Sequence, residues 1–294
     1  MSHEPIADPR EQGPKPPFPE QVQEPPGVEA EMQPQADHGQ DGYRGLGRLT
    51  DRVALVTGGD SGIGRAVALA FAREGADVAI AYLNEHEDAQ ETVRLVEEAG
   101  RRGFAVAGDI GDRSHCDALV ERTAGELGRL DILVNNAAFQ TTHDSITEHP
   151  PEEIEHIFRT NILAMFWLCQ AAVPHMQPGA AIINTTSIQA YQPDPMLLPY
   201  STTKGAIVTF TKGLAQELTP KGIRVNAVAP GPVWTPLIPM SMPVDQTTQF
   251  GEETPMGRTA QPAELAPPYV FLASDESRFV SGEILAVTGG LVTA

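Results

Sequence analysis

The sequence predicts an α/β fold in which helices cover both faces of a parallel sheet. Short apolar runs alternate with amphipathic helical segments from residue 52 onward, and this alternation is typical of doubly wound parallel sheets. A glycine-rich turn joins the first apolar run to the first helical segment, as in many folds of this class. The hydrophobic content of 41% is enough for a sizeable core. We therefore predict one doubly wound domain over residues 46–294.

The predicted strands are short apolar runs, and the predicted helices follow an apolar period of 3.6 residues. The strands are expected at residues 53–56, 78–82, 104–107, 132–134, 181–185 and 225–228. The helices are expected at residues 62–73, 88–98, 114–126, 152–174, 200–218 and 263–273. The chain shows no repeat of about 20–50 residues, which disfavours a solenoid.

Residues 1–45 form a proline-rich, acidic N-terminal extension, with nine prolines in the first 34 positions. Such a segment cannot build a core of its own. Two possibilities stay open, a solvated tail or an extended arm that lies on a neighbouring surface. The spaced apolar residues that an arm could dock are Phe18, Val22, Val28 and Met32.

The formal net charge of −19 argues against binding to nucleic acid or to an anionic membrane, since both require a basic surface. Two cysteines, Cys116 and Cys169, are too few for a disulfide framework and fit a reducing cytoplasm. We find no secretory signal pattern and no apolar stretch near the ~20 residues that span a bilayer. The eight histidines lack metal-binding spacings, so solvated surface histidines and no metal site are expected.

The turn after the first predicted strand reads Thr57-Gly58-Gly59-Asp60-Ser61-Gly62-Ile63-Gly64. Its glycines let backbone N–H groups approach a pyrophosphate at the positive end of the following helix. A strand before the turn and a helix after it are the context that such a site needs. The turn predicts dinucleotide binding, with a glycine-rich loop that binds nothing as the alternative.

A second motif, Tyr200-Ser201-Thr202-Thr203-Lys204, suits proton transfer. On a helix, the i,i+4 spacing places the Tyr200 phenol and the Lys204 ammonium on one face. The pKa of free tyrosine is about 10, and a neighbouring cation lowers it. Pro199 fits the first turn of a helix, and Ser187 precedes Tyr200 by thirteen residues. The alternative is an ordinary amphipathic helix in which the tyrosine packs.

Taken together, the glycine spacing G-x-x-x-G-x-G and the Tyr-x3-Lys motif resemble the classical short-chain dehydrogenase/reductase family, from about residue 49 to the end. Other marks of that family follow in order, namely Asp109-Ile110, Asn135-Asn136-Ala137-Ala138, Asn161 and Pro230-Gly231. Ala138 stands where the family has glycine. The resemblance implies a single Rossmann-like domain with a parallel seven-stranded sheet.

The resemblance also implies an enzyme that transfers hydride to or from NAD(P). Tyr200 is expected to exchange a proton with the substrate oxygen, and Ser187 to hydrogen-bond that oxygen. Lys204 is expected to bind the nicotinamide ribose and lower the pKa of Tyr200, while Asn161 holds a water. The expected cofactor contacts are Gly58, Asp60, Ser61, Gly62, Ile63, Gly64, Asn84, Asp109, Ile110, Asn135, Ala137, Tyr200, Lys204, Pro230, Gly231 and Val233.

The end of the second predicted strand reads Ala81-Tyr82-Leu83-Asn84. It offers neither the carboxylate that binds the ribose of NAD nor an arginine that accepts a 2′-phosphate. Without the carboxylate a repulsion against the phosphate is lost, so the sequence favours NADP. Arg65 or Asn84 would be the phosphate contacts.

Residues 234–261 correspond to the most variable region of the family, the substrate loop. Its apolar residues are Trp234, Leu237, Ile238, Met240, Met242, Phe250 and Met256. Such a loop either closes over a small substrate or packs on the surface without gating. Gln140, Gln189 and Gln192 are further candidates for the pocket wall. The apolar loop and the acidic charge favour a small neutral aldehyde, ketone or alcohol.

The extension, with the segments TGGDSGIG and SIQAYQP, resembles a bacterial subgroup that includes an NADP-dependent aldehyde reductase and general-stress oxidoreductases. This resemblance favours an ordered arm that contacts a neighbouring subunit, and a homotetramer built through helices 152–174 and 200–218. One rival function is a dinucleotide-binding sensor without turnover. An enoyl reductase would place the lysine further from the tyrosine, and an extended-type sugar epimerase would use another glycine spacing.

Overall fold

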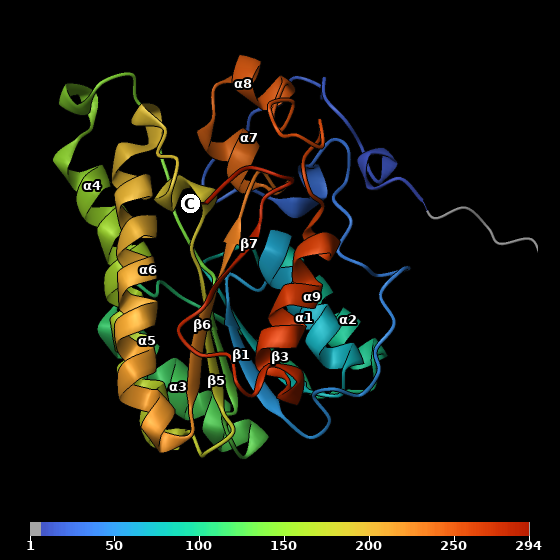
Figure 1. Ribbon diagram of the computed structural model, residues 1–294, viewed down its shortest axis with the longest axis vertical. Coiled ribbons are helices and arrows are strands. Elements are labelled where there is room, and N and C mark those ends of the chain that lie inside the picture. Colours follow the sequence, from blue (N-terminus) through green and yellow to red (C-terminus); the bar gives the residue numbers. More distant parts are fainter. Residues whose placement is uncertain (1–6, 294) are drawn as a thin grey trace, which may run out of the picture.

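The computed structural model describes residues 7–293, in which seven parallel strands form a central sheet (Figure 1). The strand order is β3-β2-β1-β4-β5-β6-β7. The strands are β1 Val53–Thr57, β2 Asp77–Tyr82, β3 Gly103–Ala107, β4 Ile132–Asn135, β5 Ala181–Thr185, β6 Arg224–Pro230 and β7 Ile284–Val287. The predicted doubly wound α/β class is confirmed, and β7 is the strand that the apolar pattern did not mark.

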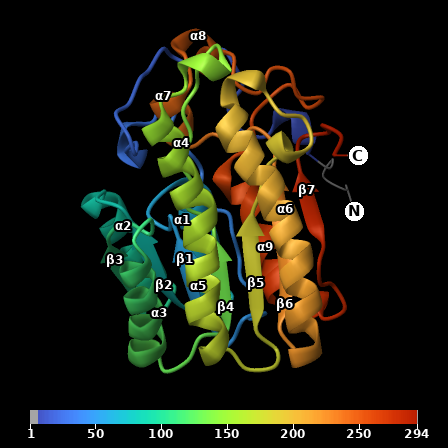
Figure 2. The same ribbon diagram turned by 90° about the vertical axis from the view of Figure 1, so that its left-hand side faces the viewer.

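Helices lie on both faces of the sheet, with α3 to α6 on one face and α1, α2 and α9 on the other (Figure 2). They are α1 Gly62–Arg73, α2 His86–Glu98, α3 Arg113–Leu127, α4 Pro151–Phe158, α5 Ala164–Ala172, α6 Leu198–Leu218, α7 Leu237–Ser241, α8 Val244–Thr248 and α9 Pro262–Ala273. Each face of the sheet has its own cluster of buried apolar side chains, which explains why the strands are apolar on both sides. Within residues 7–293, none of the helices combines the length and apolar character needed to cross a membrane.

The chain changes direction in the sheet between β1 and β4, which are neighbours although β2 and β3 intervene in sequence. In open parallel sheets, ligands bind in the crevice beyond the carboxyl ends of the strands at such a point. Gly58 follows β1 and Ala137 follows β4, and a Cβ added to Gly58 would lie 3.0 Å from the Cα of Ala137. The fold therefore brings the glycine turn and the asparagine motif to the same crevice.

The prediction of a single helix over residues 152–174 is wrong in one respect. A π-helical turn, Arg159–Leu163, separates α4 from α5, and Asn161 lies in it. The wider turn inserts an extra residue, which an apolar pattern with a 3.6-residue period does not reveal, and such turns often occur at functional sites. The predicted helix at residue 200 begins two residues earlier, so that Pro199 lies inside its first turn.

The N-terminal extension packs on its own chain. Its first described part lies near Arg258, and it then passes α8 and α7 before it crosses the start of α1 and of α9 and leads into β1 (Figure 1). Phe18 and Met32 are only 5% and 1% exposed and join an apolar cluster with Trp234. Of the other predicted docking residues, Val22 is 68% exposed and Val28 is partly buried. A solvated tail is therefore wrong for residues 7–45, whereas contact with a neighbouring subunit stays a prediction.

Polar anchors fix the end of the extension to α1. The phenol of Tyr43 donates to Glu74 Oε1 over 2.7 Å, and Arg48 Nη2 donates to the same oxygen over 2.6 Å. Burial alone would raise the pKa of Glu74, but the hydrogen bonds from Arg48 and Tyr43 outweigh it and lower the pKa to about 2. Glu74 thus stays ionised and holds the extension at the C-terminal end of α1.

Candidate active site

A cavity of about 910 Å³ lies at the carboxyl ends of the strands. The glycine turn lines one end of it, and Ser187 and Tyr200 line the other. Pockets for cofactors are commonly concave and largely pre-formed, and this one joins the two sequence motifs in one space. Its volume and lining suit a dinucleotide with a small second molecule beside it.

The glycine turn leaves its backbone open to the cavity. Gly58 and Gly62 have φ values of 60° and 47°, a region that favours glycine. A Cβ on Gly64 would lie 1.8 Å from the carbonyl oxygen of Gly58, so no side chain fits between the turn and α1. The first N–H groups of α1 have no carbonyl partners within their own helix, and anions bind well at such helix ends. These residues therefore fit the phosphates of a dinucleotide.

Most of the predicted cofactor residues line this cavity. They are Gly58, Asp60, Ser61, Gly62, Ile63, Asp109, Ile110, Ala137, Tyr200, Lys204, Pro230, Gly231 and Val233. Gly64 does not line it and instead lies against Gly58. Asn135 is buried between strands, where its Nδ2 donates to Asn184 Oδ1 over 2.9 Å. Asn84 is exposed and does not line the cavity.

The expected phosphate contact Arg65 is also placed elsewhere. Its side chain is buried under the glycine turn, where Nε donates to the carbonyl oxygen of Asp60 over 2.8 Å. Its Nη2 pairs with Asp88 Oδ1 over 3.0 Å. The expectation that Arg65 holds a 2′-phosphate is therefore wrong in this structure, because its side chain supports the turn from below. Asn84 is exposed between the lining residues Leu83 and Glu85, so its expected contact with the 2′-phosphate stays a prediction.

Asn136 is a site residue to which sequence reasoning assigned no role. Its Nδ2 donates to the carbonyl oxygens of Thr57 and Gly58 over 3.1 and 3.2 Å, and it lines the cavity. It thereby ties the end of β4 to the glycine turn. The Asn135-Asn136 pair in the sequence could have indicated this role, but only Asn135 was expected to contact the cofactor.

Tyr200 and Lys204 lie one turn apart at the start of α6, as the spacing predicted. Lys204 Nζ is 5.1 Å from the centroid of the Tyr200 ring and donates to the carbonyl oxygen of Thr185 over 2.9 Å. Ser187 follows β5, and its Oγ accepts from the N–H of Gln189 over 3.1 Å. All three side chains are buried and line the same end of the cavity.

Burial dominates the acid–base properties of this pair. It raises the pKa of Tyr200 to about 12, against the opposing effect of a hydrogen bond with Ser187. Burial also lowers the pKa of Lys204 to about 7. The expected lowering of the Tyr200 pKa is therefore not found, because desolvation disfavours the phenolate and only the hydrogen bond with Ser187 opposes it. Tyr200 carries its proton at neutral pH and is placed to donate it.

Asn161 lies behind the cavity wall rather than in it. Its Oδ1 accepts from the N–H of Phe139 over 2.8 Å, and its Nδ2 donates to the carbonyl oxygen of Phe139 and to Thr203 Oγ1 over 3.0 and 3.1 Å. The amide thus joins the segment after β4 to α6, next to Lys204. Its expected role in holding a water stays a prediction.

The substrate loop forms the roof over the Tyr200 end. Leu237, Ile238, Met242 and Phe250 line the cavity, whereas Trp234 is fully buried against the extension. The predicted wall residues Gln140, Gln189 and Gln192 line the cavity, as do Gln246 and Gln249. The substrate end therefore combines an apolar roof with a wall rich in side-chain amides.

The expectation of solvated histidines is wrong for His38 and His149, which are 5% and 6% exposed. The possible ligand atoms of His143, His149 and Glu153 lie within 4.8 Å of one another, on the loop before α4 and at its start. His143 Nε2 pairs with Glu153 Oε2 over 2.8 Å. Because such side chains can hold a metal ion, the expectation of no metal site stays a prediction.

Comparisons with known proteins agree with this geometry. A family model described as Enoyl-(Acyl carrier protein) reductase matches residues 58–292. The oxidoreductase YghA from Escherichia coli (strain K12) is 50% identical over 292 residues, which are 99% of either chain. Glucose and ribitol dehydrogenase from Daucus carota is 48% identical over 282 residues, which cover 94% of this chain and 97% of that protein.

Among solved structures, a short chain dehydrogenase from Burkholderia cenocepacia J2315 in complex with NADP has a TM-score of 0.78 and is 35% identical. The match covers 98% of that chain but 83% of this one. The fold around the cavity is thus shared with proteins that are shorter than this chain.

Proposed function

Since the chain belongs to the classical short-chain dehydrogenase/reductase family of NAD(P)-dependent oxidoreductases, we propose that it transfers hydride between NADP and a small aldehyde, ketone or alcohol. The observation that supports this most directly is that Ser187, Tyr200 and Lys204 meet in the cavity that the glycine turn also lines. The nicotinamide, when bound, supplies or accepts the hydride.

Tyr200 acts as the general acid in the direction of carbonyl reduction. Its pKa of about 12 keeps the phenol protonated at neutral pH, so that it can donate to the oxygen on which charge develops. Ser187 hydrogen-bonds the same oxygen and fixes its position. Lys204, whose Nζ lies 5.1 Å from the centroid of the Tyr200 ring, binds the cofactor ribose. Oxidation of an alcohol uses the same groups in reverse.

NADP is the favoured cofactor, and the Burkholderia relative was solved in complex with NADP. Lys204 is the only lysine or arginine among the lining residues that the structure describes. We therefore expect the 2′-phosphate to be held by the Ser61 hydroxyl and by backbone N–H groups of the turn. Separate dissociation constants for NADPH and NADH check this, and a preference above tenfold for NADH would contradict it.

The amide-rich wall favours a neutral substrate that can form several hydrogen bonds. A side-chain amide both donates and accepts, which matches a hydroxyl group in either role. The carrot relative is named as a glucose and ribitol dehydrogenase, so polyols and sugars belong in the substrate panel beside simple aldehydes. The wall includes five glutamines, Gln140, Gln189, Gln192, Gln246 and Gln249.

The test is steady-state oxidation of NADPH with aldehydes, ketones and sugars, and reduction of NADP with alcohols and polyols. Turnover of at least one carbonyl–alcohol pair is expected. Tight cofactor binding without turnover of any pair would favour the sensor instead. The description of the family model suggests an enoyl reductase, but the one-turn spacing of Tyr200 and Lys204 on α6 disfavours that activity. An enoyl thioester in the substrate panel distinguishes an enoyl reductase from a carbonyl reductase.

We also propose a cytoplasmic homotetramer. Leu163 just before α5, Phe166 in α5 and Leu198 at the start of α6 are exposed apolar side chains. These helices are the ones expected to pair between subunits. Buried free thiols at Cys116 and Cys169 fit a reducing compartment. Light scattering of the full chain gives the mass directly, and Phe166→Glu is expected to lower it.

A further inference from the structure

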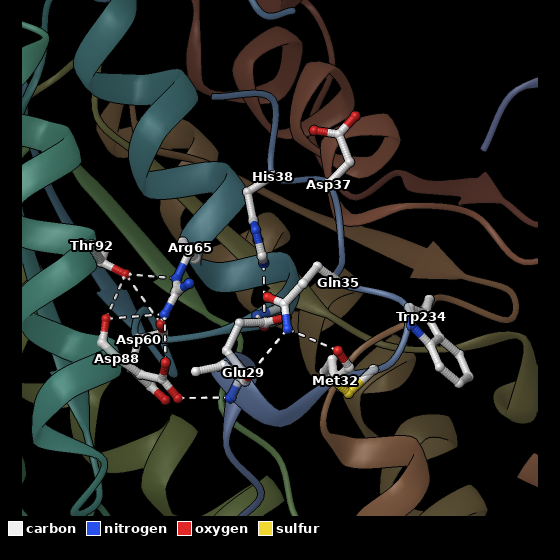
Figure 3. Close-up of polar contacts among 12 residues, drawn as sticks. Glu29, Met32, Gln35, Asp37, His38, Asp60, Arg65, Asp88, Thr92 and Trp234 are labelled. Carbon is white, nitrogen blue, oxygen red and sulfur yellow. Dashed lines mark hydrogen bonds and ion pairs between the residues drawn. The ribbon is translucent and has the colours of Figure 1, made fainter. Parts of the chain in front are cut away.

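The N-terminal extension reaches the glycine turn through a single buried carboxylate. Glu29 is 1% exposed, and its Oε2 accepts a hydrogen bond from the N–H of Gly62 over 2.7 Å (Figure 3). Gly62 is the first residue of α1, so its N–H is one of those that the helix itself leaves without a partner. Glu29 therefore accepts a hydrogen bond from one of the N–H groups at the end of α1 that faces the cofactor cavity.

A second path leads from the same residue to the cavity wall. The backbone N–H of Glu29 donates to Asp88 Oδ2 over 2.7 Å, and Asp88 Oδ1 pairs with Arg65. Arg65 in turn donates to the carbonyl oxygen of Asp60 (Figure 3). Asp60 and Gly62 both line the cavity, so Glu29 is linked to two positions of the turn by separate routes.

The extension also holds Glu29 in place from behind. His38 Nε2 lies 3.2 Å from Glu29 Oε2, and the indole N–H of Trp234 donates to the carbonyl oxygen of Pro34 over 2.9 Å. Phe18 stacks on Trp234 with ring centroids 4.0 Å apart. The segment that carries Glu29 is thus fixed against the start of the substrate loop, and Pro26 within it lines the cavity.

The electrostatics favour an ionised Glu29. Burial would raise its pKa, but the contacts with His38, Gly62 and Arg65 outweigh burial and lower the pKa. A carboxylate at a helix N-terminus is stabilised by the helix dipole. Because glycine has the widest backbone freedom, a hydrogen bond to the N–H of Gly62 restrains the turn at one of its most flexible positions.

We propose that Glu29 is a positioning residue of the dinucleotide site, so that the extension forms part of the cofactor site of its own chain. Glu29 acts through Gly62 and Asp60 and sets the geometry in which the turn meets the cofactor phosphates. The inference rests on the proposed function in one respect only, that the cavity binds a nicotinamide dinucleotide.

The test compares Glu29→Ala with Glu31→Ala in the full chain. Glu31 lies in the same short 3-10 helix, Glu29–Glu31, but is exposed, so it controls for loss of charge in the extension. The readout is the dissociation constant of NADPH, measured from its fluorescence without substrate. We expect about tenfold weaker binding for Glu29→Ala, because the loss of the fixed turn geometry outweighs the removal of a negative charge near the phosphates. We expect no change for Glu31→Ala, and a turnover number at saturating NADPH within about twofold of the original protein.

A third variant, Glu29→Gln, keeps an oxygen for the Gly62 N–H but loses the charge that faces His38. It is expected to bind NADPH with intermediate affinity, and it provides the test if Glu29→Ala does not fold. Equal affinities of the Glu29 and Glu31 variants would overturn the inference. So would a Glu29 variant that loses turnover at saturating NADPH in parallel with binding, since that pattern indicates general destabilisation. If the original protein binds no dinucleotide, the proposed function fails first.

Discussion

The two ends of the cavity are built in different ways. At the catalytic end, Ser187, Tyr200 and Lys204 lie close together in sequence, and Lys204 reaches Thr185 across 19 residues. At the glycine-turn end, Glu29 reaches Gly62 and Asp88 across 33 and 59 residues. The first set belongs to one strand–loop–helix unit, whereas the second depends on a segment that has almost no regular structure of its own.

This difference separates the residues that carry out proton transfer from the residues that hold the cofactor-binding turn in place. A proton donor and its partner can be placed by the i,i+4 spacing of one helix. The glycine turn has little stiffness of its own and is held by side chains from α1, α2, the segment after β4 and the extension. We therefore expect substitutions at the catalytic end to affect turnover. Substitutions in the extension should affect cofactor binding and the stability with which the extension docks on its own chain.

The largest expected effect is at the catalytic end. Tyr200→Phe removes the proton that is donated to the substrate oxygen, so turnover should fall at least about a hundredfold. Binding of NADPH should stay within about twofold, because the ring and Lys204 remain. Tyr191→Phe is the control, since Tyr191 lies close by but does not line the cavity. Near-normal turnover of Tyr200→Phe would contradict the role of Tyr200.

The next effect concerns the docking of the extension. Phe18→Ala removes a buried ring that stacks on Trp234, which should weaken docking by about 3 kcal/mol. Hydrogen exchange at the N–H of Gln23, which donates to Pro239 over 3.0 Å, should accelerate about a hundredfold if exchange follows local opening. Val22→Ala, at an exposed position, should leave the exchange rate unchanged. Equal rates in both variants would show that the Phe18–Trp234 stack does not hold the extension.

The smallest effect tests the charge of the glycine turn. Burial raises the pKa of Asp60 to about 7, so Asp60 is mostly neutral at pH 6 and mostly ionised at pH 8. An ionised Asp60 repels the phosphates, and the affinity for NADH should fall several-fold as the pH rises through 7. NADH is the suitable ligand because it lacks a 2′-phosphate that titrates near pH 6. In Asp60→Asn the change in affinity should be smaller, because only Lys204, whose pKa burial lowers to about 7, still titrates beside the cofactor in this range. A pH dependence in Asp60→Asn equal to that of the original protein would contradict the assignment.

The raised pKa of Asp60 also affects the stability of the folded protein. Between about pH 4 and pH 7 the folded protein keeps a proton on Asp60 that the unfolded chain has lost. The contribution of Asp60 to the free energy of unfolding therefore falls as the pH rises through this window. A bound dinucleotide should increase the effect, because its charge favours the protonated form.

Much of the fold and of the catalytic end could be predicted from the sequence. The glycine turn, Ser187, Tyr200 and Lys204 lie in regular elements or directly after them, and their spacings map onto the structure. The π-helical turn around Asn161 could not be predicted, because one extra residue in a turn leaves little trace in the apolar pattern. The direction of the Tyr200 pKa shift was also missed, since it depends on burial, which the sequence does not show.

The glycine-turn end was less predictable for a physical reason. Arg65 has the right charge and lies close in sequence to the turn, yet the carboxylate of Asp88 and the carbonyl of Asp60 hold it under the loop. Nothing in the sequence indicated a buried role for Glu29, because an isolated acidic residue in a proline-rich segment is usually solvated. Only the tertiary structure shows that the extension docks and buries this carboxylate.

The most direct test of the central claim is hydride transfer itself. The protein is supplied with NADPH that carries deuterium at the transferring position of the nicotinamide, together with the best carbonyl substrate of the panel. The account predicts an alcohol product that gains one deuterium at the former carbonyl carbon, with product formation at least about a hundredfold slower in Tyr200→Phe. Tight binding of NADPH with no deuterated product from any carbonyl in the panel would contradict it.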